Sequence, residues 1–442
     1  MLRFLPIMVV AAGGYFLLRL RAFFLLHPIR TLALAGAEYR KEGKGAFFRL
    51  SLALAGTLGV GNVTGVAAGI LIGGAGSVFW ILVSAIFSAP LKYAESVASA
   101  VKEKGKERSL GFPSLIRKSF PLIGAPLASI YALLTVGLAF FMGSALQGAA
   151  AAETVSALMG SGAGLFCALL FAFILMLCVL GDSERLCKAT AILIPIAMVL
   201  YTIVCIITIF CGISNIKTVA FLILKDAFSL RAFSGGAVGA VLASPLKEGF
   251  FRGLLSNEAG AGTSAYAHAK GEVGSPFSEG ILGVFEILFD TVVLCMLTAF
   301  SILLSVGDPQ AFSSGTELLS AAFSSALGDL YAWPLIASVF LFALSSAVCW
   351  YEYGRCALKV LGCRGGRLYF GAYLFFCILG VLFGTMPLIG LCDAFLFALS
   401  LLAIPTLIKN SAAVCAETDR ALGRGAKRTA ARGGGSENKR TD

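Results

Sequence analysis

The sequence predicts an all-α polytopic membrane protein with eleven transmembrane helices: one N-terminal helix, then a 5+5 inverted-repeat core with two discontinuous helices. Of 442 residues, 58% are hydrophobic and only 13% are charged, with a mean hydropathy of +0.90, whereas about a quarter of a soluble domain is charged. Apolar runs of membrane-spanning length recur, for example at 123–141, 165–180 and 189–210, and do not alternate as barrel strands do. Two of the long segments are interrupted by glycine-rich sequence.

The first segment has Arg3 before an apolar run, as a signal peptide has, but the run continues to Leu20 and Arg21 follows it. A retained helix is therefore predicted. The eleven predicted spans are 4–20, 46–71, 76–100, 121–150, 163–180, 189–212, 236–268, 277–305, 332–360, 368–383 and 385–408. They divide the chain into 1–45, an N-terminal transmembrane helix and cytoplasmic linker; 46–212, a first five-helix repeat; 213–235, an extracellular amphipathic segment; 236–408, a second, inverted five-helix repeat; and 409–442, a disordered basic cytoplasmic tail.

The formal charge of +11 is unevenly placed. Positive residues gather in four stretches: 19–49, 102–118, 355–367 and the tail after 409. They are sparse in 150–164 and 304–334, where the charged residues are acidic. By the positive-inside rule this pattern predicts a multi-pass protein of the plasma (inner) membrane, with its N-terminus outside and its C-terminus cytoplasmic. The same placement argues against a nucleic-acid partner, because it forms no phosphate-binding face.

The second predicted span carries glycines at 56, 59, 61 and 65 near its centre. Each glycine lowers helix stability by up to about 1 kcal/mol relative to alanine. Near-GxxxG spacing also suits close helix packing, so the glycines alone leave both interpretations open. Asn62 favours an interruption, because a carboxamide at membrane depth needs hydrogen-bonding partners and broken backbone in a membrane lines a cavity or is covered by protein.

The seventh predicted span repeats this pattern at 253–263, GLLSNEAGAGT. Five spans separate one interrupted helix from the other, and an odd number of helices per repeat inverts the second half. Interrupted helices at matching positions of two inverted repeats indicate a transporter with a binding site near the membrane midplane. The N-terminal ends of half-helices then face a substrate carboxylate, and the opposite carbonyls face cations.

Four blocks resemble the alanine/glycine:cation symporter family. They are GTLGVGNVTGVAAGILIGGAGSVFW at 56–80 with the following Lys92 and Glu95, RGLLSNEAGAGTSAYAHA at 252–269, EILFDTVVLCMLTAF at 286–300 and LFALSSAVCWYEYG at 341–354. The resemblance implies the 5+5 fold of the amino acid–polyamine–organocation superfamily and sodium-coupled transport of alanine or glycine. It implies sodium as coupling ion but no cofactor and no chemical conversion. The expected partners are therefore alanine or glycine, sodium and the lipid bilayer, with no obligate protein partner.

The resemblance also implies a substrate site between the interrupted helices and their neighbours. Its residues are Val60 and Gly61 through their amides, with Asn62 alongside; Gln147; Gly253, Leu254, Leu255 and Ser256 as backbone of the second interruption; and Ser346 and Trp350, which close the site. A sodium ion is expected between the carbonyls of Ala55 and Leu58 and the hydroxyls of Ser345 and Ser346. For these two serines, hydrogen bonding to their own helix is the alternative.

Departures from the family pattern at Ala75, Ala261 and Ser346 leave the substrate and the cation open. Asp290, at membrane depth, is a candidate for a proton relay, for ordering the nearby break, or for a structural hydrogen bond. Lys247, Glu248, Arg252 and Glu258 are expected to form gating or structural pairs, and His268 is expected at the membrane interface.

Two other functions remain open: a proton-coupled amino-acid transporter, and a non-transporting membrane sensor that binds an amino acid. The chain contains no HExxH, GxSxG or Walker sequence, and an enzyme is therefore not expected.

Overall fold

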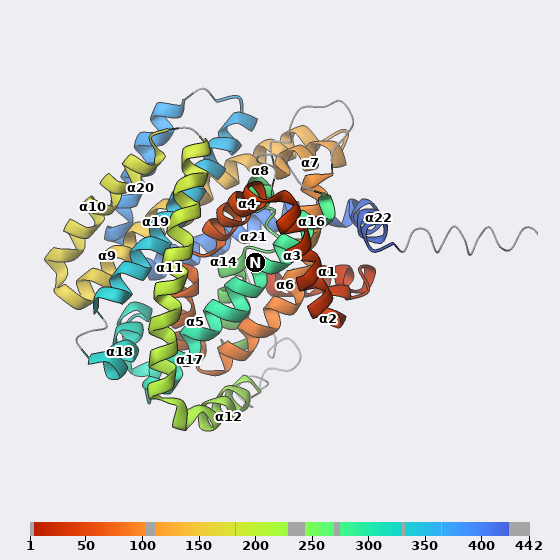
Figure 1. The fold of residues 1–442 in the computed structure, drawn as a ribbon. Helices are drawn as coiled ribbons and strands as arrows, with labels where there is room; N and C mark the ends of the chain where they lie inside the picture. Colours follow the sequence, from red (N-terminus) through yellow and green to blue (C-terminus); the bar gives the residue numbers. More distant parts are fainter. Residues whose placement is uncertain are drawn as a thin grey trace, which may run out of the picture.

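A computed structural model describes residues 4–101, 111–181, 183–228, 244–268, 275–328, 332–363 and 365–423, and this part of the chain contains helices but no strand (Figure 1). The elements in chain order are α1 (Leu5–Arg19), α2 (Phe23–Leu26), α3 (Pro28–Glu42), α4 (Lys44–Thr57), η2 (Val60–Asn62), α5 (Thr64–Gly73), α6 (Gly76–Ala100), α7 (Phe112–Ser119), α8 (Gly124–Leu138), η3 (Ala139–Ala145), α9 (Leu146–Met159), α10 (Ser161–Val179), α11 (Ser183–Cys211), η4 (Ile213–Asn215), α12 (Ile216–Ala227), α14 (Ser244–Asn257), α15 (Ala265–His268), α16 (Pro276–Ile287), η6 (Leu288–Cys295), α17 (Met296–Ser305), η7 (Pro309–Ala311), α18 (Gly315–Leu327), α19 (Ala332–Val360), α20 (Gly366–Phe383), α21 (Thr385–Lys409) and α22 (Ser411–Ala421).

Within the described residues, eight helices are long and apolar enough to cross a membrane, and a bent pair, Leu50–Thr57 with Val60–Gly73, raises that number to nine. Eleven spans were expected. The first expected span is only 15 residues long as α1, and the seventh begins in residues outside the described part. The structure therefore supports a multi-pass helical bundle, while the number eleven stays a prediction.

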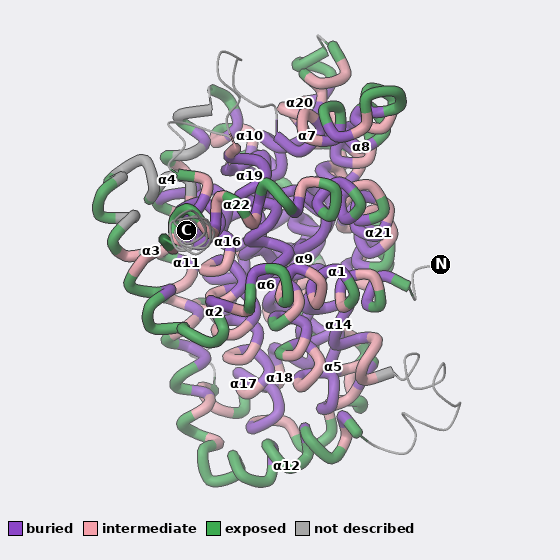
Figure 2. The backbone as a smooth tube through the Cα atoms, turned by 90° about the vertical axis from the view of Figure 1, so that its right-hand side faces the viewer, coloured by how far each residue is buried: buried purple, intermediate pink, exposed green. Residues whose placement is uncertain are grey.

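Outward-facing apolar side chains cover α10 and α11. They include Leu165, Phe166 and Phe173 on α10 and Ile192, Val199 and Phe210 on α11, all at least half exposed. A surface of this kind is costly in water and suits contact with lipid chains. Figure 2 shows the buried backbone gathered in the middle of the bundle and the exposed backbone along α12.

The first interruption lies where glycines 56–65 predicted it. Helix α4 ends at Thr57, a single 3-10 turn covers Val60–Asn62, and α5 resumes at Thr64 after a bend of 54°. The backbone at the break is extended at Gly59, a conformation that a helix cannot continue through. The predicted discontinuity of the second span is therefore confirmed.

The second interruption lies between α14, which ends at Asn257, and the short helix α15, which begins at Ala265. Glu258 has a left-handed φ of +54°, and Gly260 and Gly262 have φ of +86° and +80°. Such values end a right-handed helix and favour glycine. The position of this break differs from the expectation, because residues 253–256 lie inside α14 and the break begins at Glu258.

The remaining elements close around this core. Helix α1 packs on α6 so tightly that a Cβ at Gly13 would overlap the backbone of Phe87. Helix α12 lies across one end of the bundle in both views, where Asp226 accepts a hydrogen bond from the Gly76 amide at 2.7 Å. The amphipathic segment expected at 213–235 contains this helix, Ile216–Ala227, in its described part.

A disordered tail was expected from residue 409, but the structure contains a further helix after this residue. Helix α22 occupies 411–421, and Thr418 shares a hydrogen bond of 2.7 Å with the Tyr93 hydroxyl of α6. The sequence 411–421 has no apolar period, so its docking through a few buried positions was not visible in the pattern. The basic residues after 423 lie outside the described part.

Candidate functional site

The two interruptions meet in the middle of the bundle. A Cβ built on Gly61 would lie 3.6 Å from the Cα of Ser256 and 3.7 Å from the carbonyl oxygen of Leu255. The backbone of η2 therefore approaches the last turn of α14 so closely that a methyl group at Gly61 would just fill the space between them. The two discontinuous helices predicted from separate parts of the sequence thus come together.

Asn62 connects both interruptions through Asp290 of η6. Its side-chain amide donates to Asp290 Oδ1 at 2.6 Å and to the Asp290 carbonyl at 3.1 Å. Ser256 of α14 donates to the other carboxylate oxygen at 2.7 Å, as does Thr291 at 2.8 Å. All four residues are at most 1% exposed. A buried carboxylate with three donors is well stabilised, and it holds the two breaks in register.

Gln147 holds the first interruption from the opposite side. Its Oε1 accepts from the Val60 amide at 3.3 Å, and its Nε2 donates to the Met142 carbonyl at 2.9 Å. Met142 lies in η3, a π-helical segment, and Asp290 lies in η6, a second one. π-Helical segments frequently mark functional sites, because they re-aim side chains and backbone groups within a helix. Nothing in the sequence pattern signalled either segment.

Helix α19 completes the cluster with Ser346 and Trp350. A Cβ on Gly59 would lie 2.9 Å from Ser346 Oγ and 3.2 Å from Gln147 Nε2, so both side chains lie close to the Gly59 backbone. The Trp350 indole donates to the Gly56 carbonyl at 3.3 Å and packs edge-on against the Tyr353 ring at 5.3 Å. The indole therefore covers the end of α4 directly before the break.

The two serines expected to bind sodium differ in their hydrogen bonds. Ser345 Oγ donates to the Phe342 carbonyl at 2.9 Å, which is the alternative of bonding to its own helix. Ser346 is 1% exposed and its Oγ has no hydrogen-bond partner among the described residues. An unpaired buried hydroxyl is costly and leaves an oxygen available for a hard cation. Ala55 and Leu58 are fully buried at the end of α4, whose last carbonyls lack helical partners.

The residues predicted from the second interruption separate into two groups. Leu255 and Ser256 lie against Gly61 and Asp290, whereas Gly253 packs against α6, where a Cβ would overlap Ser84 Oγ. Leu254 is buried, and its carbonyl accepts from the Glu258 amide at 2.8 Å. The expectation that 253–256 supply the backbone of the second interruption is wrong, because these residues lie inside α14, which ends at Asn257, directly before the left-handed backbone at Glu258.

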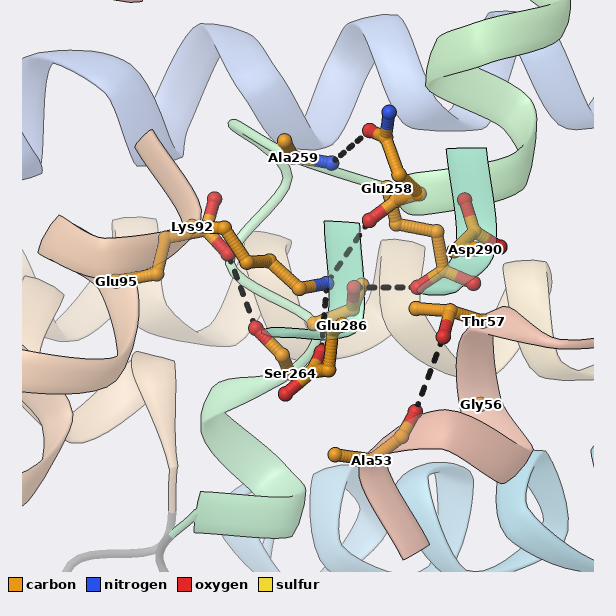
Figure 3. A network of polar contacts seen from close by, with 12 residues as sticks. Ala53, Gly56, Thr57, Lys92, Glu95, Glu258, Ala259, Ser264, Glu286 and Asp290 are labelled. Carbon is orange, nitrogen blue, oxygen red and sulfur yellow. Dashed lines mark hydrogen bonds and ion pairs between the residues drawn. The ribbon is translucent and has the colours of Figure 1, made fainter. Parts of the chain in front are cut away.

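A buried network of charged groups surrounds the second interruption (Figure 3). Lys92 Nζ donates to the Asn257 carbonyl at 2.9 Å and lies 3.4 Å from Glu286 Oε2. Glu95 accepts from the Gly260 amide at 2.5 Å and from Ser264 at 3.1 Å. The sequence indicated Lys92 and Glu95 only as part of a family block. In the structure both lie on α6, where Lys92 contacts the last residue of α14 and Glu95 contacts the loop that forms the second interruption.

His268 was expected at the membrane interface, but the structure places it in the interior of the bundle. It is fully buried, with Nδ1 2.7 Å from Glu279 Oε2 and Nε2 2.8 Å from Glu286 Oε1. The expectation failed because α15 ends on the inner side of α16 rather than at a surface. The spacing of Glu279 and Glu286, seven residues apart on one face of a helix, was the available signal.

The charged residues before the second interruption do not form one cluster. Arg252 donates to Asp393 Oδ2 of α21 at 2.7 Å and lies 3.6 Å from Glu248, which pairs with Lys247 at 2.9 Å. Glu258 is separate and accepts from Thr263 instead. An ion pair thus links α14 to α21. Asp393 is a carboxylate inside an apolar segment and could have been singled out on that ground.

A helical membrane bundle whose two interrupted helices meet around buried polar groups has the architecture of a secondary transporter. The model of the sodium:alanine symporter family matches residues 1–427, and the chain belongs to this family. It is accordingly a cation-coupled amino-acid transporter and not an enzyme.

Relatives are consistent with this assignment. AgcS of Methanococcus maripaludis, described as a sodium/alanine symporter, is 29% identical over 432 residues, which cover 94% of this chain and 93% of that protein. GlnT of Bacillus subtilis, described as a probable sodium/glutamine symporter, is 30% identical over 363 residues, covering 80% and 73%. The crystal structure of MhsT in complex with L-phenylalanine has a TM-score of 0.62 and 15% identity, covers 82% of this chain and 88% of that one, and shows a shared fold.

Proposed function

We propose that this protein is a sodium-coupled symporter that carries a small neutral amino acid, alanine or glycine, into the cell by alternating access. The observation that carries the proposal is the close approach of the first interruption, at Gly61, to Ser256 in the last turn of α14, bridged by Asn62 and Asp290. One ligand bound there touches both halves of the bundle. Its binding free energy can therefore shift the equilibrium between two arrangements of those halves.

The substrate carboxylate is proposed to bind at the start of α5. The first amides of a helix lack internal partners and carry the positive end of its dipole. Val60 N, which bonds to Gln147 in this structure, and Gly61 N are the donors nearest to the break. Gly59 leaves little room beside Ser346, since a Cβ there would lie 2.9 Å from Ser346 Oγ, which favours a small substrate side chain. The name of GlnT makes glutamine a necessary competitor in any test of selectivity.

Sodium is proposed to bind between the last carbonyls of α4, at Ala55 and Leu58, and the hydroxyls of Ser345 and Ser346. The free Ser346 oxygen supports this assignment. The two repeats 46–212 and 236–408, and an N-terminus outside with a cytoplasmic C-terminus, complete the proposed topology. The matching positions of the two interruptions and the charge bias support them.

Ser346→Ala is expected to raise the sodium concentration for half-maximal alanine uptake about tenfold, because one cation ligand worth roughly 1.4 kcal/mol is lost. Uptake at saturating sodium should largely return. Ser338→Ala is the matched control, since Ser338 lies on the same helix, is fully buried and bonds to the Pro334 carbonyl. A sodium dependence unchanged in Ser346→Ala and equal to that of the control would reject the ligand assignment.

Uptake of labelled L-alanine into proteoliposomes tests the proposed function. We expect accumulation under an inward sodium gradient and none when potassium replaces sodium. Unlabelled glycine, glutamine and leucine, added as competitors, identify the substrate. Accumulation driven by a proton gradient without sodium would instead support proton coupling through Asp290, whose carboxylate both interruptions contact. Binding of alanine without any flux would indicate a sensor.

A further inference from the structure

The loop of the second interruption contains a buried carboxyl group that the proposed transport site does not use. Glu258 is 2% exposed, and its Oε2 accepts from Thr263 Oγ1 at 2.5 Å. Its Oε1 has no hydrogen-bond partner among the described residues. A bare carboxylate oxygen in a dry interior is strongly disfavoured, whereas a protonated carboxyl group tolerates such a site. The backbone at Glu258 also has a φ of +54°, a conformation that side-chain-bearing residues rarely adopt.

The surroundings of Glu258 carry too much negative charge for every carboxyl group to be ionised. Among the described residues, four buried carboxyl groups face two buried cations in this region: Glu95, Glu258, Glu286 and Asp290 against Lys92 and His268, all at most 2% exposed. Even with both cations charged, two of these carboxylates would stay uncompensated. Uncompensated charges in a low-dielectric interior cost several kcal/mol each, and the usual response is to bind a proton.

Hydrogen bonds indicate which group holds a proton. Asp290 accepts from three donors, and Glu95 accepts on both oxygens from Gly260 and Ser264, so both suit the ionised form. His268 lies between two carboxylates and shares its ring protons with them. Glu286 Oε2 also lacks a hydrogen bond, but it lies 3.4 Å from Lys92 Nζ. Among Glu95, Glu258, Glu286 and Asp290, Glu258 alone has an oxygen with neither a hydrogen bond nor an ion pair among the described residues.

Other titratable groups also act on Glu258 electrostatically. They come from each element packed around the loop: Lys92 and Glu95 of α6, Tyr131 of α8, Asp290 of η6, Tyr353 of α19 and Cys392 of α21. Of these, Lys92 is the cation, and it is already engaged by Asn257 O and Glu286. An added cation at the midplane would therefore supply the compensating charge that the region lacks.

We propose that Glu258 is a proton-binding residue and that its proton is released when sodium and the amino acid bind. The O–H bond of the carboxyl group breaks, the carboxylate remains beside Lys92, and the proton leaves to water. Near this loop, Glu286, His268 and Glu279 form a hydrogen-bonded line that ends at Glu279, close to the start of the membrane-spanning helix α16. The transporter would then exchange a proton for its sodium-coupled cargo.

This inference rests on the proposed function, and calorimetry separates the two. L-alanine is titrated into the purified full-length protein in saturating sodium chloride, in phosphate and in Tris at one pH. The two buffers differ in ionisation enthalpy, so the difference in heat counts protons. We expect release of up to about one proton per alanine bound. No binding heat would contradict the proposed function; binding heat without proton release would overturn the proton site.

Glu258→Gln is expected to bind alanine with no proton release. Glu153→Gln is the matched control, because Glu153 accepts from Thr385 N at 2.7 Å, Thr385 Oγ1 at 2.8 Å and Thr316 Oγ1 at 3.2 Å, far in sequence from the second interruption. It should release protons as the unmodified protein does. Proton release retained in Glu258→Gln would reject the residue assignment.

If Glu258→Gln does not bind alanine, the pH dependence of proton release in Thr263→Ala tests the proposal instead. It removes the one hydrogen bond that stabilises the ionised form of Glu258, so the pH at which proton release is half-maximal should move to a higher value. A pH profile identical to that of the unmodified protein would overturn the proposal.

Discussion

Replacing Asn62 with alanine is expected to weaken L-alanine binding about 100-fold while the protein stays folded. The change removes the amide that donates to Asp290 Oδ1 at 2.6 Å and leaves that carboxylate one donor short in a fully buried place. Hydrogen bonds to charged groups contribute roughly 1.5–3 kcal/mol, and a loss near the upper value corresponds to this change in affinity. Calorimetry in saturating sodium measures the dissociation constant.

Asn410→Ala is the matched control. Its side-chain amide also makes two hydrogen bonds, to Ser119 Oγ and the Thr406 carbonyl, but at the end of α21. This variant should bind alanine as the unmodified protein does. Size-exclusion profiles and thermal unfolding in detergent report whether each variant is folded. A folded Asn62→Ala protein with unchanged affinity would show that the first interruption is not part of the binding site.

Replacing Gln147 with alanine is expected to weaken L-alanine binding about 10- to 100-fold. Two hydrogen bonds between neutral groups are lost, each contributing about 0.5–1.5 kcal/mol, and the Val60 amide loses its partner. The cavity left by the side chain further loosens the contact with Gly59. We expect the smaller of the two effects here, because Gln147 carries no contact with a charged group.

The chain offers a direct comparison, because its other glutamine, Gln310, is exposed in η7. Gln310→Ala should leave alanine affinity unchanged. If Gln147→Ala binds alanine as tightly as Gln310→Ala does, the proposed position of the substrate beside Val60 is wrong.

Much of the fold follows from residue patterns. The apolar runs determine where helices lie, since a membrane admits few other structures, and glycines 56–65 with Asn62 locate the first interruption to within a few residues. The backbone of the second interruption was expected at 253–256, but the interruption begins at Glu258. Gly253 suggested a weak point in the helix, yet it permits close packing on Ser84, and the chain breaks at Glu258 instead. Glycine composition does not distinguish a packing role from a conformational one.

The candidate site was predictable where one residue type demands a partner. A carboxamide at membrane depth must be hydrogen-bonded, which singled out Asn62, and a carboxylate at that depth singled out Asp290. That the two bond to each other depends on the meeting of η2 and η6, and no local pattern encodes that. The same holds for His268, whose partners come from the next helix, and for the two π-helical segments, which depend on tertiary packing.

Coupled flux tests the central claim most directly. In proteoliposomes with equal sodium on both sides, an inward gradient of L-alanine is imposed and the entry of labelled sodium is followed. We predict that alanine drives sodium inward in the unmodified protein and fails to do so in Asn62→Ala. Sodium entry that is independent of alanine, or alanine entry without sodium, would contradict the account of a symporter whose two interrupted helices share one binding site.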